Sequence, residues 1–319
     1  MVGLPASCLA DKAPSEPQQE RSTPVTPLTI IPDIHADADR LRRSVAAAPR
    51  AGSLAFLGDL IDAGPEVGRP ADLEVLQEVR GLVEAGRAHV VMGNHELNAI
   101  LFHRVGPDNA PLRSRSEKNA RQHRSFCDAF GTGTPDALYW TEWFLAFPLW
   151  RDLGGARLVH ACWNDEDIAT ISARRPDARL RPEDLEEVAA KTSAFAKAVN
   201  NLLTGPELGL PEGVSFHDKG GHERHHARIA WWRSNARTWR RASLSVPNPD
   251  ALPDSEIGSF DAVKFYPEGS PPVFVGHYKM LGEPIVDVPN AVCLDYPKTP
   301  CVYLWHGEAT LRGELLRHV

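Results

Sequence analysis

The chain has 319 residues, of which 42% are hydrophobic and 24% are charged, and its formal net charge at pH 7 is -7. This length and apolar content can bury a sizeable core, and the acidic balance gives no general attraction to nucleic acid, although it suits a cleft that takes up cations. No apolar run approaches the ~18 residues that a membrane-spanning helix needs, so we expect no membrane embedding. The five cysteines are odd in number and show no Cys-x-x-Cys spacing, which argues against a disulfide framework and favours a reducing, cytoplasmic location.

Residues 1–26 contain several Pro, Ser, Glu and Gln residues and show no charged stretch followed by an apolar one. Such a segment cannot bury enough apolar surface to fold, so we predict a disordered leader and not a signal peptide. We expect residues 27–319 to form a single α/β domain, since no clear linker interrupts them.

Three short apolar runs open the predicted domain, at residues 28–31, 53–57 and 89–92. Each is followed by apolar residues at helical spacing, so the order is strand, helix, strand, helix, strand, helix. This order predicts parallel strands with right-handed crossovers, and in such sheets a site lies beyond the carboxyl ends of the strands. The candidate N-caps of the first two helices are Asp37 or Asp39 and Asp72.

Side chains that can bind a metal ion follow each of these three strands. Asp33 and His35 follow the first strand, and since residues two apart in an extended segment face the same way, both can reach one cation. The second strand is followed by Asp59 and Asp62, and the third by Asn94 and His95.

Two later strands also end in histidine. Residues 156–159 run into His160, and residues 273–275 run into Gly276 and His277. With the first three, these make five predicted strands that end in a candidate oxygen or nitrogen ligand.

The segment between these two strands, residues 162–271, is the least regular third of the chain. We predict that it is an inserted, mostly helical cap, with one helix that begins at Pro182 and stops at Gly205. The spacing of the last apolar runs predicts an antiparallel meander. These runs are residues 291–294, 302–305 and 310–315.

Singly, each ligand pattern is weak, because Asp-x-His occurs often by chance and a lone histidine at a strand end is more often a hydrogen-bonded structural residue. Together they predict a metal centre. Carboxylates mixed with imidazoles, without thiolates, suit two divalent or trivalent first-row ions, Mn²⁺ first, with Fe, Co or Zn as alternatives. The predicted ligands are Asp33, His35 and Asp59 on one metal, and Asp59, Asn94, His160 and His277 on the other, with Asp59 bridging.

Two metal ions ~3.5–4 Å apart can clamp the attacking and leaving oxygens of a displacement at phosphorus and lower the pKa of bound water toward ~7. We predict that His95 faces the substrate and protonates the departing oxygen, a role worth roughly 10²–10⁴-fold in rate. Asp62 is placed to orient that imidazole and keep it charged. The alternative is that Asp62 only caps the turn at Gly64 and Pro65.

In this order, Asp-x-His, Gly-Asp-x-x-Asp, Gly-Asn-His-Glu, His and Gly-His resemble the calcineurin-like metallophosphoesterase superfamily, nearest its bacterial serine/threonine phosphoprotein phosphatase-like branch. The resemblance runs from about Leu28 to Gly307 and covers residues 162–271 loosely. It implies an α/β fold, a four-layer αββα sandwich around a dinuclear metal centre, and it carries the ligands, the acid and the orienting carboxylate over onto the residues above. It also implies that the parallel first part and the antiparallel end of the chain form the two sheets.

The chain departs from that branch at two places. Residues 32–36 read Pro-Asp-Ile-His-Ala where the branch usually reads Gly-Asp-x-His-Gly, and Ala63 stands where a phosphate-binding arginine usually follows the orienting Asp. The second departure removes a bidentate phosphate contact, so it leaves the substrate class open. We predict substrate contacts from Arg228 or Arg233, and from Tyr278 lining the pocket.

These residues predict a metal-dependent hydrolase of phosphate esters in which two metals activate a hydroxide. We expect phosphomonoesters, including phosphoproteins, as substrates. The alternatives are a nucleotide pyrophosphohydrolase of the diadenosine-tetraphosphate type and a phosphodiesterase. A degenerate, non-catalytic fold is a further alternative, against which the presence of every predicted ligand and of His95 argues.

A rival of another class is a nucleic-acid-binding protein. Residues 222–241 carry six Arg, three His and three Trp against one Glu. Basic residues interleaved with aromatic ones can hold phosphates and stack bases. The other interpretations of this segment are a solvated helix with its tryptophans packed inward and a cap that faces the substrate, and we expect no nucleic-acid partner.

Overall fold

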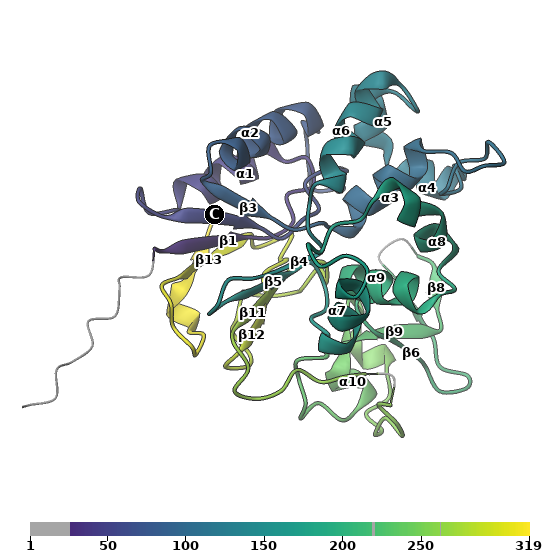
Figure 1. The fold of residues 1–319 in the computed structure, drawn as a ribbon. Helices are drawn as coiled ribbons and strands as arrows, with labels where there is room; N and C mark the ends of the chain where they lie inside the picture. Colours follow the sequence, from purple (N-terminus) through teal and green to yellow (C-terminus); the bar gives the residue numbers. More distant parts are fainter. Residues whose placement is uncertain (1–25, 219–220, 262) are drawn as a thin grey trace, which may run out of the picture.

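The computed structural model describes residues 26–218, 221–261 and 263–319, so the predicted leader, apart from Thr26, lies outside the described residues. Two mixed β-sheets form the centre of the molecule (Figure 1). The strands of the first sheet are, in spatial order, β14 (Leu316–His318), β13 (Cys301–Trp305), β1 (Leu28–Ile31), β2 (Ser53–Phe56) and β3 (Ala88–Val90). Strands β1, β2 and β3 are parallel, as predicted, β13 pairs antiparallel with β1, and β14 pairs antiparallel with β13.

The strands of the second sheet are β12 (Ala291–Cys293), β11 (Val273–Val275), β5 (Arg157–Val159) and β4 (Trp150–Asp152). Strand β11 is parallel to both β12 and β5, and only β4 is antiparallel. The predicted meander is therefore wrong, since its first strand lies in the second sheet and its second strand in the first. Residues 313–315 form a 3₁₀ turn, and the last strand begins at Leu316. Periodicity shows that a run is a strand, but it does not show the edge with which the strand pairs.

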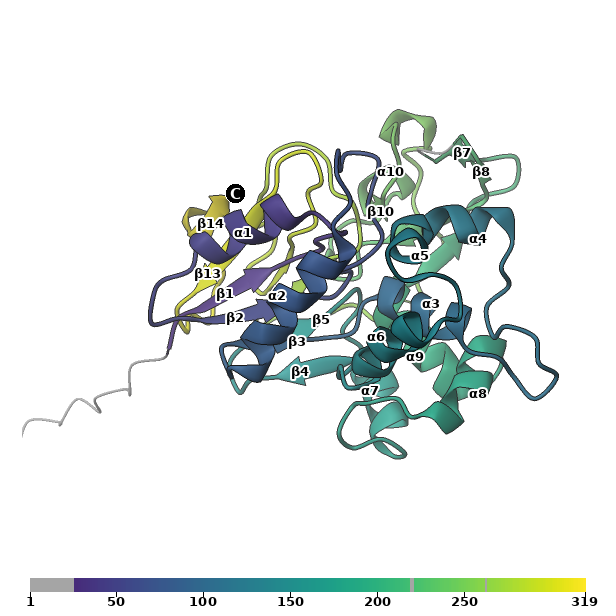
Figure 2. The ribbon, with the colours of Figure 1, turned by 90° about the horizontal axis from the view of Figure 1, so that it is seen from above.

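The two sheets pack face to face through alternate residues of their strands. Ile30 of β1 and Phe274 of β11 belong to the hydrophobic cluster between the sheets. Ile31 and Phe56 point the opposite way, into the larger cluster, which contains side chains of α1 (Ala38–Ala46) and α2 (Asp72–Glu84). Figures 1 and 2 show these two helices lying over the first sheet. The predicted α/β sandwich is confirmed, and each fully buried aliphatic side chain contributes roughly 1.5–3 kcal/mol to its stability.

The two predicted caps behave differently. Asp37 caps α1, where its carboxylate accepts a hydrogen bond from the Arg40 N–H at 2.9 Å. Asp72 is the first residue of α2, and its carboxylate accepts from the N–H of Asp62 at 3.1 Å. The second cap prediction is therefore wrong, because Asp72 holds a loop and not the start of its own helix.

Helices also fill the space after β3 and the first half of residues 162–271. The predicted helix from Pro182 to Gly205 is interrupted, because Lys191 adopts a left-handed backbone and Ser193 caps a new helix. After Thr204 this segment consists of short strands, the four-residue helix α10 and irregular stretches. Among the described residues, no helix combines the length and the apolar character that crossing a bilayer requires. The helices are α3 (Asn94–His103), α4 (Glu117–Gln122), α5 (Arg124–Phe130), α6 (Pro135–Leu145), α7 (Asp165–Ser172), α8 (Leu185–Ala190), α9 (Ala194–Thr204) and α10 (Trp239–Ala242). The short strands are β6 (Glu207–Gly209), β7 (Phe216–His217), β8 (Glu223–Arg224), β9 (His226–Ile229) and β10 (Ser243–Leu244).

The loops after β2 and β3 touch each other through two glycines. A Cβ added to Gly93 would lie less than 3.0 Å from the backbone nitrogen and a carboxylate oxygen of Asp59. A Cβ added to Gly58 would meet the backbone of Gly93 as closely. Only glycine at both positions allows this approach, which brings the ends of β2 and β3 together.

We expect Gly93→Ala to lower the free energy of unfolding by about 1–3 kcal/mol, because the added methyl group has no space. Gly81→Ala is the matched control, since nothing lies within 4 Å of a Cβ added at this position in α2. It should raise the free energy of unfolding by about 0.5–1 kcal/mol. Urea titrations of both variants measure the two effects, and a Gly93→Ala variant as stable as the unchanged protein would contradict the close approach.

Candidate functional site

The predicted metal ligands converge where the carboxyl ends of the two sheets meet. The Nε2 atom of His160 lies 3.4 Å from an Asp59 carboxylate oxygen and 3.0 Å from the Asn94 side-chain oxygen. The same Asn94 oxygen lies 2.7 Å from Nδ1 of His277. Asp59 and Asn94 follow strands of the first sheet, and His160 and His277 follow strands of the second. The site therefore spans the sandwich.

The backbone turns sharply where the strands deliver these side chains. His35, Asp59, Asp62 and His277 all have φ between +51° and +72°. This left-handed region is unfavourable for residues with a Cβ, and such conformations persist where the surrounding structure holds them in place. Four of the ten described non-glycine residues with positive φ are predicted site residues.

Hydrogen bonds to backbone carbonyls orient two of the imidazoles. The Nδ1–H of His160 donates to the Leu57 carbonyl at 2.8 Å, and the Nδ1–H of His35 donates to the Ile61 carbonyl at 3.3 Å. In the neutral rings, Nε2 then carries a lone pair that faces the carboxylates. The buried Nε2 atoms of His35 and His277 have no hydrogen-bond partner among the described residues. Unpartnered buried nitrogens of this kind suit metal ligation.

The buried carboxylates of the site also favour the binding of cations. Burial and the neighbouring carboxylate of Asp295 raise the pKa of Asp33 to about 8. Burial works to lower the pKa of His160, but the Asp59 carboxylate and its hydrogen bond raise it to about 10. Carboxylates buried this closely need positive charge beside them, from protons or from metal ions.

Two groups of three side chains could each hold an ion, since their ligand atoms lie within 4.8 Å of one another. Asp59 belongs to both groups, as the predicted bridge requires. The first group includes His95, whereas the sequence predicts Asp33 as the third ligand of this ion. Asp33 is nevertheless close to the group, since one of its carboxylate oxygens lies 3.8 Å from Nε2 of His35. The groups are His35, Asp59 and His95, and Asp59, His160 and His277.

Asp33 is held by the strand that carries His277. Its two carboxylate oxygens lie 3.1 and 3.2 Å from the His277 N–H, which donates to them. A Cβ on Gly276 would lie less than 3.0 Å from one of these oxygens, so the glycine before His277 makes room for the carboxylate.

Glu96, the last residue of Gly-Asn-His-Glu, joins the loops after β2 and β3. Its buried carboxylate accepts hydrogen bonds from the N–H groups of Asp59 and Leu60 at 2.8 Å and of Gly93 at 2.9 Å. Glu96 thereby positions the loops that carry Asp59 and Asn94.

His95 and Asp62 form a pair beside the ligands. The Nδ1–H of His95 donates to an Asp62 carboxylate oxygen at 2.7 Å, and the other oxygen accepts from His123 at 2.7 Å. Burial works to lower the pKa of His95, but the carboxylates of Asp59 and Asp62 raise it to about 9. The His95 ring is therefore charged at neutral pH, and its side chain is 20% exposed. Since Asp62 uses both oxygens on imidazoles, the geometry favours the orienting role over the turn cap.

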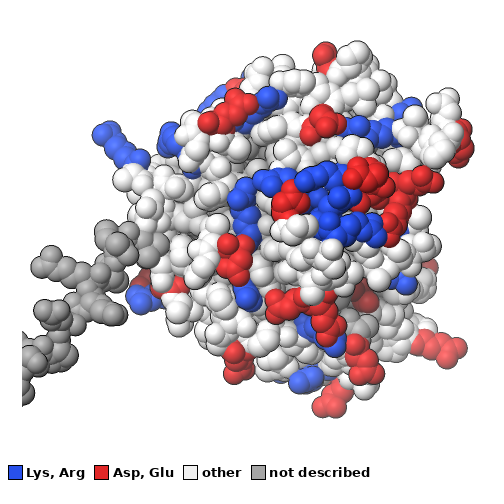
Figure 3. Space-filling view, in the orientation of Figure 1, with Lys and Arg blue, Asp and Glu red and all other residues white. Residues whose placement is uncertain are grey.

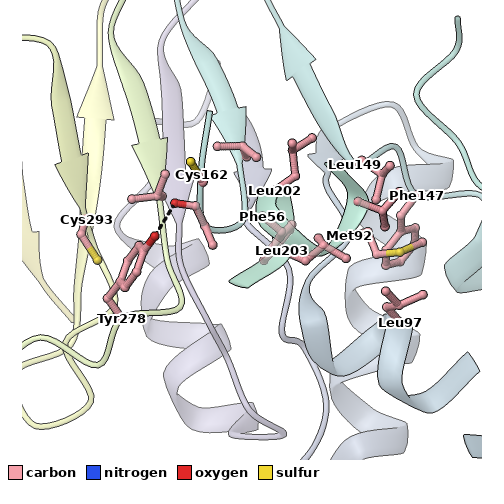
Figure 4. Close-up of a cluster of buried hydrophobic side chains, with 14 of the residues drawn as sticks. Phe56, Met92, Leu97, Phe147, Leu149, Cys162, Leu202, Leu203, Tyr278 and Cys293 are labelled. Atoms are coloured by element: carbon pink, nitrogen blue, oxygen red, sulfur yellow. Dashed lines mark hydrogen bonds between the residues drawn. The ribbon is translucent and has the colours of Figure 1, made fainter. Parts of the chain in front are cut away.

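Tyr278 is not available to line a pocket, so this prediction is wrong. Its side chain is fully buried, and its hydroxyl donates to the Ala161 carbonyl at 3.0 Å and accepts from the Trp231 indole N–H at 3.1 Å. Figure 4 shows the ring turned into the core beside Cys162.

The two predicted arginines occupy different environments. The Arg233 guanidinium is ion-paired with Asp287. Arg228 is half-buried, and its Nε lies 3.5 Å from a Glu207 oxygen. Its charge adds to burial in lowering the pKa of His277.

Lys279 is a residue that the sequence analysis missed. It is half-buried, and its charge, after burial and His95, contributes to a lowered pKa of His35, to about 3. The same charge opposes the rise of the His95 pKa. A cation two residues after a predicted ligand, His277, is the signal that could have found it.

Residues 222–241 do not offer the surface that nucleic-acid stacking requires. Trp231, Trp232 and Trp239 are 0%, 4% and 6% exposed, so their rings belong to the core. The segment contains two short strands and the start of α10 and is not the helix considered in the sequence analysis. On the face that Figure 3 shows, Lys and Arg are interspersed with Asp and Glu.

Comparisons with known proteins show the family to which the chain is similar. Residues 26–187 match the family model of the calcineurin-like phosphoesterases. The chain is 27% identical over 294 residues to a symmetrical bis(5'-nucleosyl)-tetraphosphatase of Methylococcus capsulatus, a match that covers 89% of this chain and 90% of that protein. It is 34% identical over 150 residues to a protein of the same name from Ralstonia nicotianae, over 46% of this chain and 47% of that protein. A solved serine/threonine phosphatase from Saccharomyces cerevisiae has a TM-score of 0.44 and 13% identity, over 94% of this chain and 80% of that chain.

We expect Asp59→Asn to abolish metal retention, because Asp59 belongs to both ligand groups. Mn²⁺ at about 100 times its Kd should stabilise the unchanged protein by about 2.7 kcal/mol, and the variant should lose this stabilisation. Elemental analysis after dialysis and thermal unfolding with and without Mn²⁺ measure the two effects. Asp39→Asn is the control, since that carboxylate is 81% exposed on α1. An Asp59→Asn variant that retains its ions would contradict the bridging assignment.

Proposed function

The chain belongs to the calcineurin-like phosphoesterase family of metal-dependent hydrolases, and we propose that it cleaves phosphate esters with His95 as the proton donor to the departing oxygen. The observation that carries this proposal is the 2.7 Å hydrogen bond between His95 and Asp62, beside the converging ligand side chains.

The proposed metal ligands suit two first-row cations, Mn²⁺ first. When bound, such cations stabilise charge on phosphoryl oxygens and lower the pKa of water. The unpartnered nitrogens of His35 and His277 support this assignment, and so does the shared position of Asp59. The ligands are Asp33, His35 and Asp59 for one ion, and Asp59, Asn94, His160 and His277 for the other.

His95 is suited to give up a proton at Nε2. Its Nδ1–H is committed to Asp62, so the transferable proton of the charged ring is on the other nitrogen. That nitrogen lies 3.8 Å from an Asp59 oxygen, next to the ligand cluster. The Asp59 and Asp62 carboxylates favour the charged ring, which can then give this proton to an oxygen that leaves with negative charge.

We propose a phosphomonoester as the substrate in preference to a dinucleoside polyphosphate, because an alkoxide or phenoxide leaving group gains more from a positioned acid than a phosphate leaving group does. The dianionic phosphate needs cations in place of the arginine absent at position 63. We propose that Lys279 and Arg228 supply them, since the charge of each acts on a predicted ligand histidine.

A second candidate is the hydrolysis of dinucleoside polyphosphates. It is favoured by the names of the two bacterial relatives, one of which matches over nine-tenths of its own length. Two positive charges at one site would also suit the several negative charges of a polyphosphate chain.

Purified protein with Mn²⁺ should hydrolyse p-nitrophenyl phosphate, and faster than bis(p-nitrophenyl) phosphate. Diadenosine tetraphosphate, assayed in parallel, tests the second candidate, and a much higher kcat/KM for it would replace the first. A preparation that retains metal and hydrolyses none of the three substrates would contradict the proposed function.

We expect His95→Ala to retain its metal ions and to lose about 10²–10⁴-fold in kcat on an alkyl phosphate, with a smaller loss on p-nitrophenyl phosphate. The difference arises because a nitrophenolate leaves with little need of a proton. Unchanged turnover of the alkyl phosphate would show that His95 is not the acid.

Lys279→Ala should raise KM for a phosphomonoester by about tenfold, because a charged contact with the phosphate is lost. Lys264→Ala is the matched control, since that lysine pairs with Glu166 and its side chain is 57% exposed. Equal KM values for the two variants would remove Lys279 from the substrate site.

A further inference from the structure

Behind the pair of His95 and Asp62 lies a chain of buried histidines to which the proposed function assigns no role. His103 ends α3, and His123 lies between α4 and α5. Both are buried, and their Nε2 atoms lie 2.9 Å apart. The Nδ1 atom of His123 lies 2.7 Å from the Asp62 oxygen that His95 does not use.

The hydrogen bonds determine which nitrogens carry protons. The backbone N–H of Gly133 donates to Nδ1 of His103 at 3.0 Å, so this nitrogen has no proton. Burial lowers the pKa of His103 below its usual value, so its ring is neutral at pH 7 and its proton is on Nε2. That Nε2–H donates to Nε2 of His123, and the Nδ1–H of His123 therefore donates to Asp62. Every donor from Gly133 to Asp62 points in one direction.

Aromatic side chains hold the two rings in place. The Phe126 ring stacks on His123, with centroids 4.8 Å apart and planes 18° apart. Phe102 meets both histidines edge-on at 5.1 and 5.4 Å. The neighbouring backbone is tied to α5 as well, since the Ala63 N–H donates to the Ser125 hydroxyl at 2.9 Å. The loop of Asp62 is thus anchored from α5 at the position where the family's arginine is missing.

We propose that His123, oriented by His103, is a positioning residue that holds the Asp62 carboxylate and thereby aims His95 at the departing oxygen. A carboxylate that accepts from one imidazole alone can rotate, whereas Asp62 is held at both oxygens. An acid must lie within hydrogen-bond reach of its target, so this restraint acts on the rate of proton transfer. The inference rests on the proposed role of His95.

The same two histidines and Cys127 have atoms close enough to share a metal ion. The hydrogen bond from the Gly133 N–H argues against a metal ion here. It occupies the lone pair of His103 Nδ1, so the neutral ring carries its proton on Nε2, the nitrogen that faces His123, and this nitrogen has no lone pair for a metal. A chain of hydrogen bonds accounts for both contacts without an ion.

Two variants separate the hydrogen bond from the packing. His123→Phe keeps an aromatic ring beside Phe126 but removes the donor to Asp62, whereas the amide of His123→Asn can replace the Nδ1–H. We expect His123→Phe to lower kcat on an alkyl phosphate on the order of tenfold, with KM unchanged and a smaller loss on an aryl phosphate. His123→Asn should recover most of the rate. Phe130→Leu, which changes packing on Phe126 one step away from the histidines, should leave the ratio between the two esters unaltered.

A second measurement does not depend on turnover. Nitrogen NMR of ¹⁵N-histidine-labelled, unchanged protein should show His123 protonated on Nδ1 and His103 on Nε2. The opposite tautomer at His123, equal losses on both esters, no recovery in His123→Asn, or loss of a bound ion from His123→Phe would each overturn the proposal. If the unchanged protein hydrolyses no ester, the proposed function fails, and the tautomers still test the hydrogen-bond chain.

Discussion

The three hydrogen bonds that the Glu96 carboxylate accepts hold together the two loops on which the candidate site is built. A buried carboxylate is costly unless it is paired, and here it satisfies backbone N–H groups that would otherwise be buried without partners. The close approach of Gly58 and Gly93 makes these bonds possible. Asp59 and Asn94 start from the joined loops, so their distance is set by a side chain that itself need not contact a metal ion or a substrate.

Much of this arrangement could be predicted from the sequence, because the same residues encode both the strand and the ligand. An apolar run that ends in Asp, Asn or His predicts an element and the chemistry at its carboxyl end together, and the structure brings all six predicted ligands to one place. The membership of the sheets could not be predicted, because pairing between distant strands depends on contacts across the chain. For the same reason Asp72 holds the loop of Asp62 instead of its own helix, and Tyr278 faces the core.

The residues that sequence reasoning missed come from segments without a ligand pattern. His123 lies 61 residues from Asp62, in the connection between two short helices. The residues next to it in the sequence form no motif that would indicate a functional role. Lys279 follows the buried Tyr278. The burial of Tyr278 does not indicate that the charge of the next side chain lowers the pKa of His35. At Ala63, where the arginine of the phosphatase branch is absent, the backbone N–H donates to the Ser125 hydroxyl, 62 residues away in α5, and the neighbouring sequence does not reveal this contact.

The hydrogen bond between the His277 N–H and Asp33 joins residues 244 positions apart, one in each sheet. The ligand set therefore cannot exist until the strand before His277 has paired with β5 and the second sheet has closed on the first. Closing so long a loop costs entropy that local segments cannot offset alone. We therefore expect the complete ligand set to form late in folding, because a nascent chain that lacks its last 50 residues or so has neither His277 nor the strand before it.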